Sequence, residues 1–168
     1  AYSQHTPERA IKVVKLDSDW TALSTEPPVA TVPGHLEAPV PFHSFDNYHI
    51  WTSHTSGWKP NPAELITAGS MLGKWSSEGN PSGNKTTFGT QGSHILPLGV
   101  PVGGSLSGHD HGQTQTQRFL YMGDRYEPYI NTTEGSRYIF LPMEVTSDGA
   151  VRLKNMDGKA WSIADWPM

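Results

Sequence analysis

Glu37 is the residue whose setting most suggests chemistry, because it stands between apolar neighbours in the string Leu36-Glu37-Ala38-Pro39. A carboxylic acid that works near neutral pH needs a raised pKa, which burial among apolar groups supplies. About one strand and one turn later the chain reads Gly57-Trp58-Lys59-Pro60-Asn61, and the indole of Trp58 offers a flat apolar surface for a sugar ring. An acid beside such a surface suits proton transfer to a bound sugar. The structural alternatives are an exposed loop glutamate and a packed tryptophan.

Short strands joined by turns must position these residues. The 168-residue chain holds 17 glycines, 14 prolines, six tryptophans and six tyrosines, a composition typical of all-β proteins. Strands are expected at residues 11–16, 47–53, 63–70, 94–96, 118–122, 137–141, 151–153 and 161–163. No stretch has a helical period with caps. The sequence therefore predicts a single all-β domain, built as a sandwich, barrel or propeller.

The segments between these strands differ in character. Residues 25–41 contain five prolines, so we expect an irregular connection there, and it carries Glu37. Residues 78–92 and 100–117 are polar and rich in glycine, which predicts two further loops, the second of them mobile on the surface. Ser147-Asp148-Gly149 and Asp157-Gly158 predict tight hairpin turns.

Four short strings follow one another along the chain: Leu36–Pro39, Gly57–Asn61, Gly89–Gln91 and Tyr121–Tyr126. Their order resembles the second half of the catalytic domain of glycoside hydrolase family 43, in particular its exo-β-1,3-galactanase (galactan 1,3-β-galactosidase) branch. The resemblance implies blades of a five-bladed β-propeller with the active site at the central funnel. The family domain is longer, and its further carboxylates precede the acid. Residues 1–168 are thus expected to form a single partial domain of roughly three to four blades.

The resemblance also implies roles for individual residues. Glu37 would be the general acid of an inverting glycosidase that cleaves β-1,3-linked galactan or arabinogalactan. Gln91 stands where a catalytic base would act, and because an amide does not accept a proton as a carboxylate does, we expect it to orient the attacking water. The expected substrate contacts are Thr55, Trp58, Asn61 and Glu26, with a role in shaping the turn as the alternative for Thr55 and Asn61. For Gln91 the alternative is a loop glutamine bonded to the backbone.

Charge and composition exclude several classes of function. The formal net charge is −4 and no lysine or arginine cluster occurs, so neither nucleic acid nor a membrane surface is an expected partner. The absence of cysteine excludes a disulfide framework and a cysteine nucleophile. His109-Asp110-His111 resembles a metal site, but it lies in a loop of Gly, Ser and Gln without a preformed surrounding shell. We therefore predict no metal and no cofactor.

Two sequons suggest a secreted glycoprotein. Asn84-Lys85-Thr86 and Asn131-Thr132-Thr133 both stand in turn-like surroundings, where N-glycans are attached. No signal peptide and no apolar run long enough to cross a membrane is visible in the sequence. Extracellular localisation is the expectation that fits these features and a polysaccharide substrate.

Two further interpretations stay open beside the enzyme. The chain could be a propeller remnant that binds galactan without cleaving it, if the upstream carboxylates are lost. It could also be a purely structural β-protein that associates with itself through open sheet edges. The existence of an acidic upstream segment would discriminate the first from the enzyme, and the mass in solution would test the second.

Overall fold

A computed structural model describes residues 1–3, 9–24, 30–32, 34–57, 59–99, 114–125, 137–154 and 161–162. The elements are β1 (Tyr2–Ser3), β2 (Ile11–Val13), β3 (Ala30–Val32), β4 (Leu36–Ser44), β5 (Asn47–His54), β6 (Ala63–Ala68), β7 (Ser76–Gly79), the 3-10 turn η1 (Thr87–Gly89), β8 (Gln91–Pro97), β9 (Thr116–Arg125), β10 (Arg137–Thr146) and β11 (Val151–Leu153). The described chain is all-β, as predicted. None of its helical turns has the length and apolarity needed to cross a membrane.

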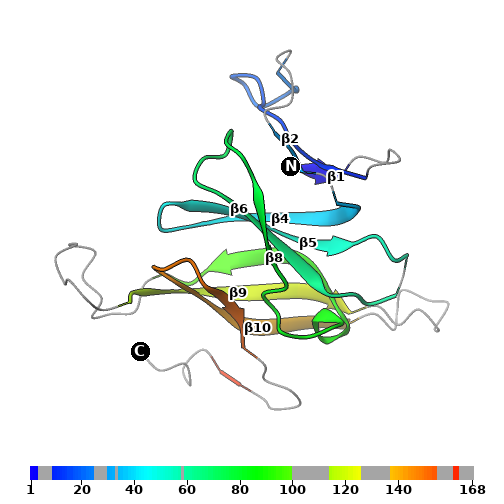
Figure 1. The fold of residues 1–168 in the computed structure, drawn as a ribbon, viewed down its shortest axis with the longest axis vertical. Coiled ribbons are helices and arrows are strands. Elements are labelled where there is room, and N and C mark those ends of the chain that lie inside the picture. The colour runs from blue at the N-terminus through cyan, green and yellow to red at the C-terminus, as the bar shows by residue number, and fades with distance from the viewer. Residues whose placement is uncertain are drawn as a thin grey trace.

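Three antiparallel sheets follow one another in chain order. The first has strand order β1-β2-β3, the second β4-β5-β6-β7 and the third β11-β10-β9-β8. Figure 1 shows them stacked, with β1 and β2 at the top, β4 to β6 in the middle and β8 to β10 below. Each sheet is a meander in which strands consecutive in the chain pair with one another. Short turns join β4 to β5 and β10 to β11, the latter at residues 147–149 as predicted.

The middle sheet buries both of its faces. Ile50 faces the first sheet and packs with Ile11 and Leu36, whereas its neighbour Trp51 faces the third sheet and packs with Tyr121. Successive residues of a strand point to opposite faces, so one strand supplies both cores. All four of the residues from Ile50 to Ser53 are buried, as is His49 before them. The middle sheet is therefore the layer on which the other two are positioned.

The expected irregular connection over residues 25–41 is wrong at its C-terminal end, because β4 begins at Leu36 and runs through Pro39 and Pro41. Proline lacks the N–H that a central strand would need, so it is tolerated on edge strands and at bulges. β4 meets both conditions. Among the described strands it pairs only with β5, and its register shifts between Glu37 and Val40. The prediction of an irregular segment here was wrong because it rested on proline content alone, which does not show whether a strand lies at a sheet edge.

Several other boundaries also differ from the sequence expectations. The loop expected at 78–92 is interrupted by β7, η1 and the start of β8, because β7 is an exposed polar edge strand with no apolar alternation to reveal it. The strand expected at 11–16 ends at Val13. Trp161 and Ser162 are not in a strand, while the hairpin expected at Asp157-Gly158 lies outside the described residues, as does most of the loop expected at 100–117.

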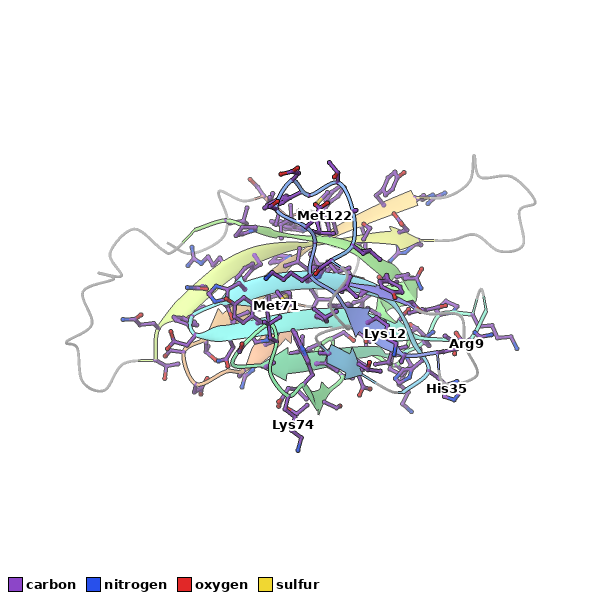
Figure 2. All side chains as sticks on the ribbon, turned by 90° about the horizontal axis from the view of Figure 1, so that it is seen from above. Arg9, Lys12, His35, Met71, Lys74 and Met122 are labelled. Carbon is purple, nitrogen blue, oxygen red and sulfur yellow. The ribbon has the colours of Figure 1, made fainter. Side chains whose placement is uncertain are left out.

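The first sheet is tied to β4 by the backbone. The N–H of Leu36 donates to the carbonyl of Arg9 at 3.0 Å, and the hydroxyl of Ser3 donates to the carbonyl of Leu36 at 3.0 Å. Arg9 and His35 lie at the same end of the molecule (Figure 2). This end of β4 carries Glu37, so the first sheet supports the strand segment on which the predicted acid stands.

Candidate active site

Glu37 is turned toward the third sheet by a β-bulge. It pairs with Ser53 and Val40 pairs with Trp51, so Ala38 and Pro39 together oppose one residue of β5. In a regular strand, residues three apart face opposite sides, whereas the extra residue places Glu37 on the same face as Val40. Ala38 takes a φ of 50°, in the left-handed region that disfavours residues with a Cβ. The half-buried Glu37 is thereby held at the entrance to the inter-sheet core.

Gln91 meets Glu37 across the two sheets. Its side-chain Nε2 donates to the hydroxyl of Ser53 at 2.7 Å and lies 3.3 Å from Oε1 of Glu37. Gln91 is the first residue of β8 and is 54 positions from Glu37 in sequence. The structure therefore brings together the two residues that the sequence analysis named as catalytic, and adds Ser53 as their shared neighbour.

An aromatic pair packs beside this polar cluster. The rings of Trp51 and Tyr121 lie 4.9 Å apart, centroid to centroid, and both side chains are fully buried. The phenol of Tyr121 lies 3.0 Å from the hydroxyl of Thr90, the residue before Gln91. Burial raises the pKa of Tyr121 to about 12, with Thr90 acting in the opposite sense. The phenol is thus neutral at physiological pH and serves as a hydrogen-bonding group.

Two glycines leave room for these rings. A Cβ on Gly92 would lie 3.1 Å from the indole of Trp51, and a Cβ on Gly123 would lie 2.9 Å from the ring of Tyr121. The two glycines are paired in register on β8 and β9. Together they bring the backbone of these strands against the aromatic pair, which sets how closely Gln91 can approach Glu37.

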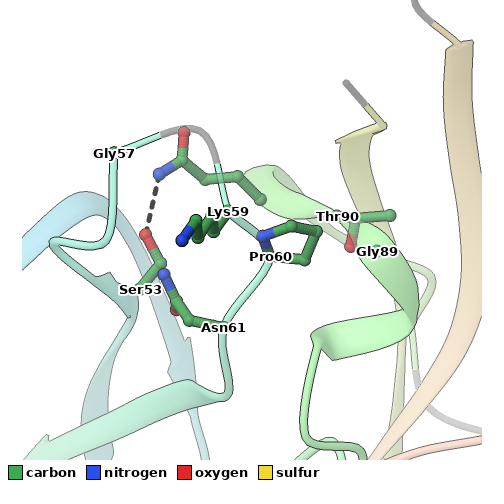
Figure 3. Close-up of a pocket in the computed structure, with 8 residues that line it drawn as sticks. Ser53, Gly57, Lys59, Pro60, Asn61, Gly89 and Thr90 are labelled. Carbon is green, nitrogen blue, oxygen red and sulfur yellow. Dashed lines mark hydrogen bonds between the residues drawn. The ribbon is translucent and has the colours of Figure 1, made fainter. Parts of the chain in front are cut away.

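A shallow, solvent-open hollow adjoins Gln91 (Figure 3). It is lined by Ser53, Gly57, Lys59, Pro60, Asn61, Gly89, Thr90 and Gln91. The hollow joins the β5–β6 loop to the segment that leads into β8. Among the lining residues Lys59 carries the charge, and its side chain is exposed. The mixture of amide, hydroxyl and ammonium groups suits a polar ligand with several hydroxyl groups.

Asn61 lines the hollow, but its side chain is committed to the loop. Its Oδ1 accepts from the N–H of His54 at 3.0 Å, and its Nδ2 donates to the carbonyl of His54 and to the hydroxyl of Ser56, each at 2.6 Å. Thr55 is half-buried and donates its N–H to the carbonyl of His35 at 3.0 Å. Of the other expected substrate contacts, Trp58 and Glu26 lie outside the described residues.

Sequence reasoning missed Ser53, Lys59 and Thr90. Ser53 could have been found from alternation, since it stands two residues after Trp51 and shares its face. Lys59 and Thr90 carried no such signal of their own, although both lie within strings of the resemblance. No group of three or more potential metal ligands occurs within the described residues, and His109-Asp110-His111 lies outside them.

Several solved structures resemble this chain. A GH43 β-1,3-galactosidase with galactodeoxynojirimycin shares 33% sequence identity with a TM-score of 0.68, covering 88% of this chain and 39% of its own. An exo-β-1,3-galactanase from Clostridium thermocellum shares 26% at a TM-score of 0.69, covering 87% and 29%. One from Phanerochaete chrysosporium with β-1,3-galactotriose shares 26% at 0.68, covering 92% and 34%.

These similarities confirm the resemblance drawn from the four sequence strings. The chain spans 29–39% of the length of these three enzymes. No protein-family model and no curated protein matches the sequence. The correspondence is therefore with part of a larger GH43 galactanase or galactosidase, and it extends over most of this chain.

Proposed function

We propose that this chain, which resembles part of the GH43 β-1,3-galactanases, is the acid-bearing portion of a glycosidase that cleaves β-1,3-linked galactan with inversion. The observation that carries the proposal is the meeting of Glu37 and Gln91 beside an open polar hollow. The solved structures named above supply the substrate class, since they are a β-1,3-galactosidase and exo-β-1,3-galactanases.

Glu37 donates its proton to the glycosidic oxygen as the bond to the anomeric carbon breaks. Water attacks that carbon from the opposite face of the ring, and Gln91 orients it through its amide oxygen. The proton that the water loses passes to bulk solvent, from which the Glu37 carboxylate regains a proton for the next cycle. An inverting site separates its two catalytic groups by about 6.5–9.5 Å. The 3.3 Å contact between Glu37 and Gln91 is shorter, so the carboxylate of Glu37 must turn away when the sugar binds, while the hydrogen bond to Ser53 keeps the Gln91 amide in place. The rotatable bonds of the Glu37 side chain permit this.

The remaining predicted contacts take distinct parts in this proposal. Trp58 stacks on a sugar face, while Thr55 and Glu26 hydrogen-bond to hydroxyls. Asn61 shapes the β5–β6 loop and so presents Lys59 and Pro60 to the hollow. The backbone and side-chain hydrogen bonds of Asn61 support this assignment.

The surroundings of the site are proposed on the same resemblance. The three sheets are blades of one propeller domain over residues 1–168, and the protein is secreted and carries N-glycans at Asn84 and Asn131. Self-association has one supporting observation: Tyr138 and Phe140 of β10 are 75% and 45% exposed. Aromatic rings on an open sheet face favour association with another apolar surface.

A non-catalytic galactan-binding role is the second candidate. It is supported by the direct Glu37–Gln91 contact, in which an amide and not a second carboxylate faces the acid. In this case the polar hollow binds galactose units and the carboxylate contributes a hydrogen bond.

Incubation with β-1,3-linked galactooligosaccharide tests the two candidates. The unmodified chain, Glu37→Gln and a control, Glu78→Gln, are compared for release of galactose. Glu78 is an exposed carboxylate on β7, so its change matches the chemistry without touching the site. Release that persists in the control and disappears in Glu37→Gln supports the acid. Equal release by all three contradicts it, and binding without release favours the binding role.

A further inference from the structure

A left-handed turn immediately precedes Gln91. Thr87, Phe88 and Gly89 have φ values of 50°, 57° and 71°. Glycine adopts such angles freely, but a β-branched threonine there is a genuine outlier. Such strain persists only where the surrounding structure imposes it, and it is concentrated at functional sites.

Strained residues gather around both proposed catalytic groups. Among the described residues, seven that are not glycine have positive φ: Arg9, Trp20, His35, Ala38, Phe45, Thr87 and Phe88. His35 and Ala38 flank Glu37, while Thr87 and Phe88 precede Gln91 by a few positions. Four of these seven residues thus lie close in sequence to the two ends of the Glu37–Gln91 contact.

Side chains from both directions hold the turn. The Oδ1 of Asn84 accepts from the N–H of Phe88 at 3.1 Å and from the N–H and hydroxyl of Thr86, each at 2.9 Å. The hydroxyl of Thr87 donates to the carbonyl of Asn61 at 2.9 Å, joining the turn to the β5–β6 loop. The turn is thus bonded to its own loop and to the opposite wall of the hollow.

Arg125 completes this set from the last residue of β9. Its guanidinium donates to the carbonyl of Phe88 at 2.7 Å, and its Nε would lie 3.9 Å from a Cβ on Gly89. A hydrogen bond from a charged donor is shorter and stronger than one between neutral groups. Arg125 therefore holds the turn three residues before Gln91, from the strand that pairs with β8.

We propose that Arg125 is a positioning residue for Gln91, which it fixes through the Phe88 carbonyl and the left-handed turn. The catalytic consequence rests on the proposed function, but the positioning itself is a property of the fold. Without the guanidinium, the strained turn relaxes and the Gln91 amide moves away from Ser53 and Glu37. A misplacement of about 1 Å at a reacting group lowers the rate by about 100-fold.

The side-chain amide of Gln91 reports this positioning directly. In the ¹⁵N-labelled full chain, its NH₂ signal is assigned with Gln91→Glu and then followed in Arg125→Lys, Arg125→Ala and the control Arg137→Ala. Arg137 pairs in register with Arg125 but is exposed. We expect Arg125→Ala to shift this signal and abolish its protection from exchange. Lysine, which can still donate to the carbonyl, should restore both, and the control should leave them unchanged.

An unmoved Gln91 signal in a folded Arg125→Ala chain overturns the proposal. If that variant does not fold, Asn84→Ala, which removes the acceptor for Phe88, must displace the same signal or the proposal fails. Where the unmodified chain hydrolyses the oligosaccharide, kcat should fall about 100-fold in Arg125→Ala with KM little changed. If the unmodified chain neither hydrolyses nor binds it, the proposed function fails while the response of the Gln91 amide still decides the positioning.

Discussion

Polar side chains are arranged differently at the two ends of the β4–β5 strand pair. At the hairpin end the register is regular, and His49 is fully buried between the hydroxyls of Ser44 at 2.8 Å and Thr67 at 3.0 Å. At the other end the ladder is bulged, and Glu37 and Gln91 are only half-buried beside an open hollow. One strand pair thus carries a closed polar network and an open one.

The difference teaches how to separate structure from chemistry among buried polar residues. His49 has a hydroxyl at each ring nitrogen and stacks on Phe42 at 4.7 Å, so its surroundings are complete within the protein. The polar groups around Glu37 face a space that a ligand can enter, and their backbone is strained. Closed networks are expected to affect stability when changed, and open ones to affect activity.

Replacement of Gln91 by alanine should have the largest effect. If Gln91 orients the attacking water, kcat should fall about 1000-fold, equivalent to about 4 kcal/mol of transition-state stabilisation. Stability should change little because the residue is at the open end. Hydrolysis of galactooligosaccharide and urea unfolding measure the two quantities. A variant that loses stability and keeps its activity would reverse the comparison.

The pH dependence of stability should report the closed end. Burial, with a smaller contribution from the charge of His43, lowers the pKa of His49 to about 4 from 6.5. The unfolded chain therefore binds a proton at a higher pH than the folded one. The part of the free energy of unfolding that depends on neutral His49 is fully present above pH 6.5 and is lost as the pH falls toward 4. It amounts to about 3 kcal/mol.

Urea unfolding at pH 7 and pH 4.5 measures this loss. His49→Gln should flatten the dependence, whereas a change at the exposed His43 should leave most of it. If the His43 variant flattens the profile and the His49 variant does not, the buried network is not its source.

Gly123→Ala should disturb the packing of the buried aromatic pair, Trp51 and Tyr121. The added methyl would lie 2.9 Å from the ring of Tyr121 and 3.1 Å from Thr90, so the aromatic pair must shift. Overpacking of this kind destabilises by about 1–3 kcal/mol. Thermal unfolding measures the loss. The matched control is Gly69→Ala, because Gly69 has open space around it. Gly149 does not serve as a control, because its φ of 92° would strain any alanine placed there.

Ala38→Gly should have the smallest effect, with opposite signs for stability and activity. Relief of the left-handed strain outweighs the added freedom of the unfolded chain, so stability should rise by about 0.5 kcal/mol. The looser bulge should hold Glu37 less firmly, which lowers kcat. A gain in both quantities would show that strain at Ala38 does not serve the acid.

The regular parts of this fold could be predicted from sequence, and the irregular parts could not. Runs of aromatic and β-branched residues between turn signals identified β5, β6 and β10, and Ser147-Asp148-Gly149 identified the last hairpin. The prolines at 39 and 41 concealed β4, because their tolerance depends on an edge position that only pairing reveals. Thr87 and Phe88 gave no sign of a left-handed turn, since glycine is the usual marker.

Only part of the candidate site could be predicted from the sequence. The four strings led to Glu37 and Gln91, but no local pattern could predict that Ser53 joins them, because this contact depends on how two sheets pack. Nor could sequence decide between a substrate contact and a turn-shaping role for Asn61, whose side chain bonds within its own loop. Tertiary packing decides which distant residues meet and which hydrogen bonds each side chain makes. A sequence pattern carries no information on that packing.

The burial of both faces of β5 has a consequence for mutational tolerance. From His49 to Ser53 no side chain points to solvent, so a substitution at any of five successive positions must be accommodated by a packed neighbour. Such a strand is expected to exchange its amide protons slowest and to vary least among working versions of the protein. Ser53 closes that run and contacts Gln91, so the proposed catalytic cluster is anchored on a segment that is packed on both faces.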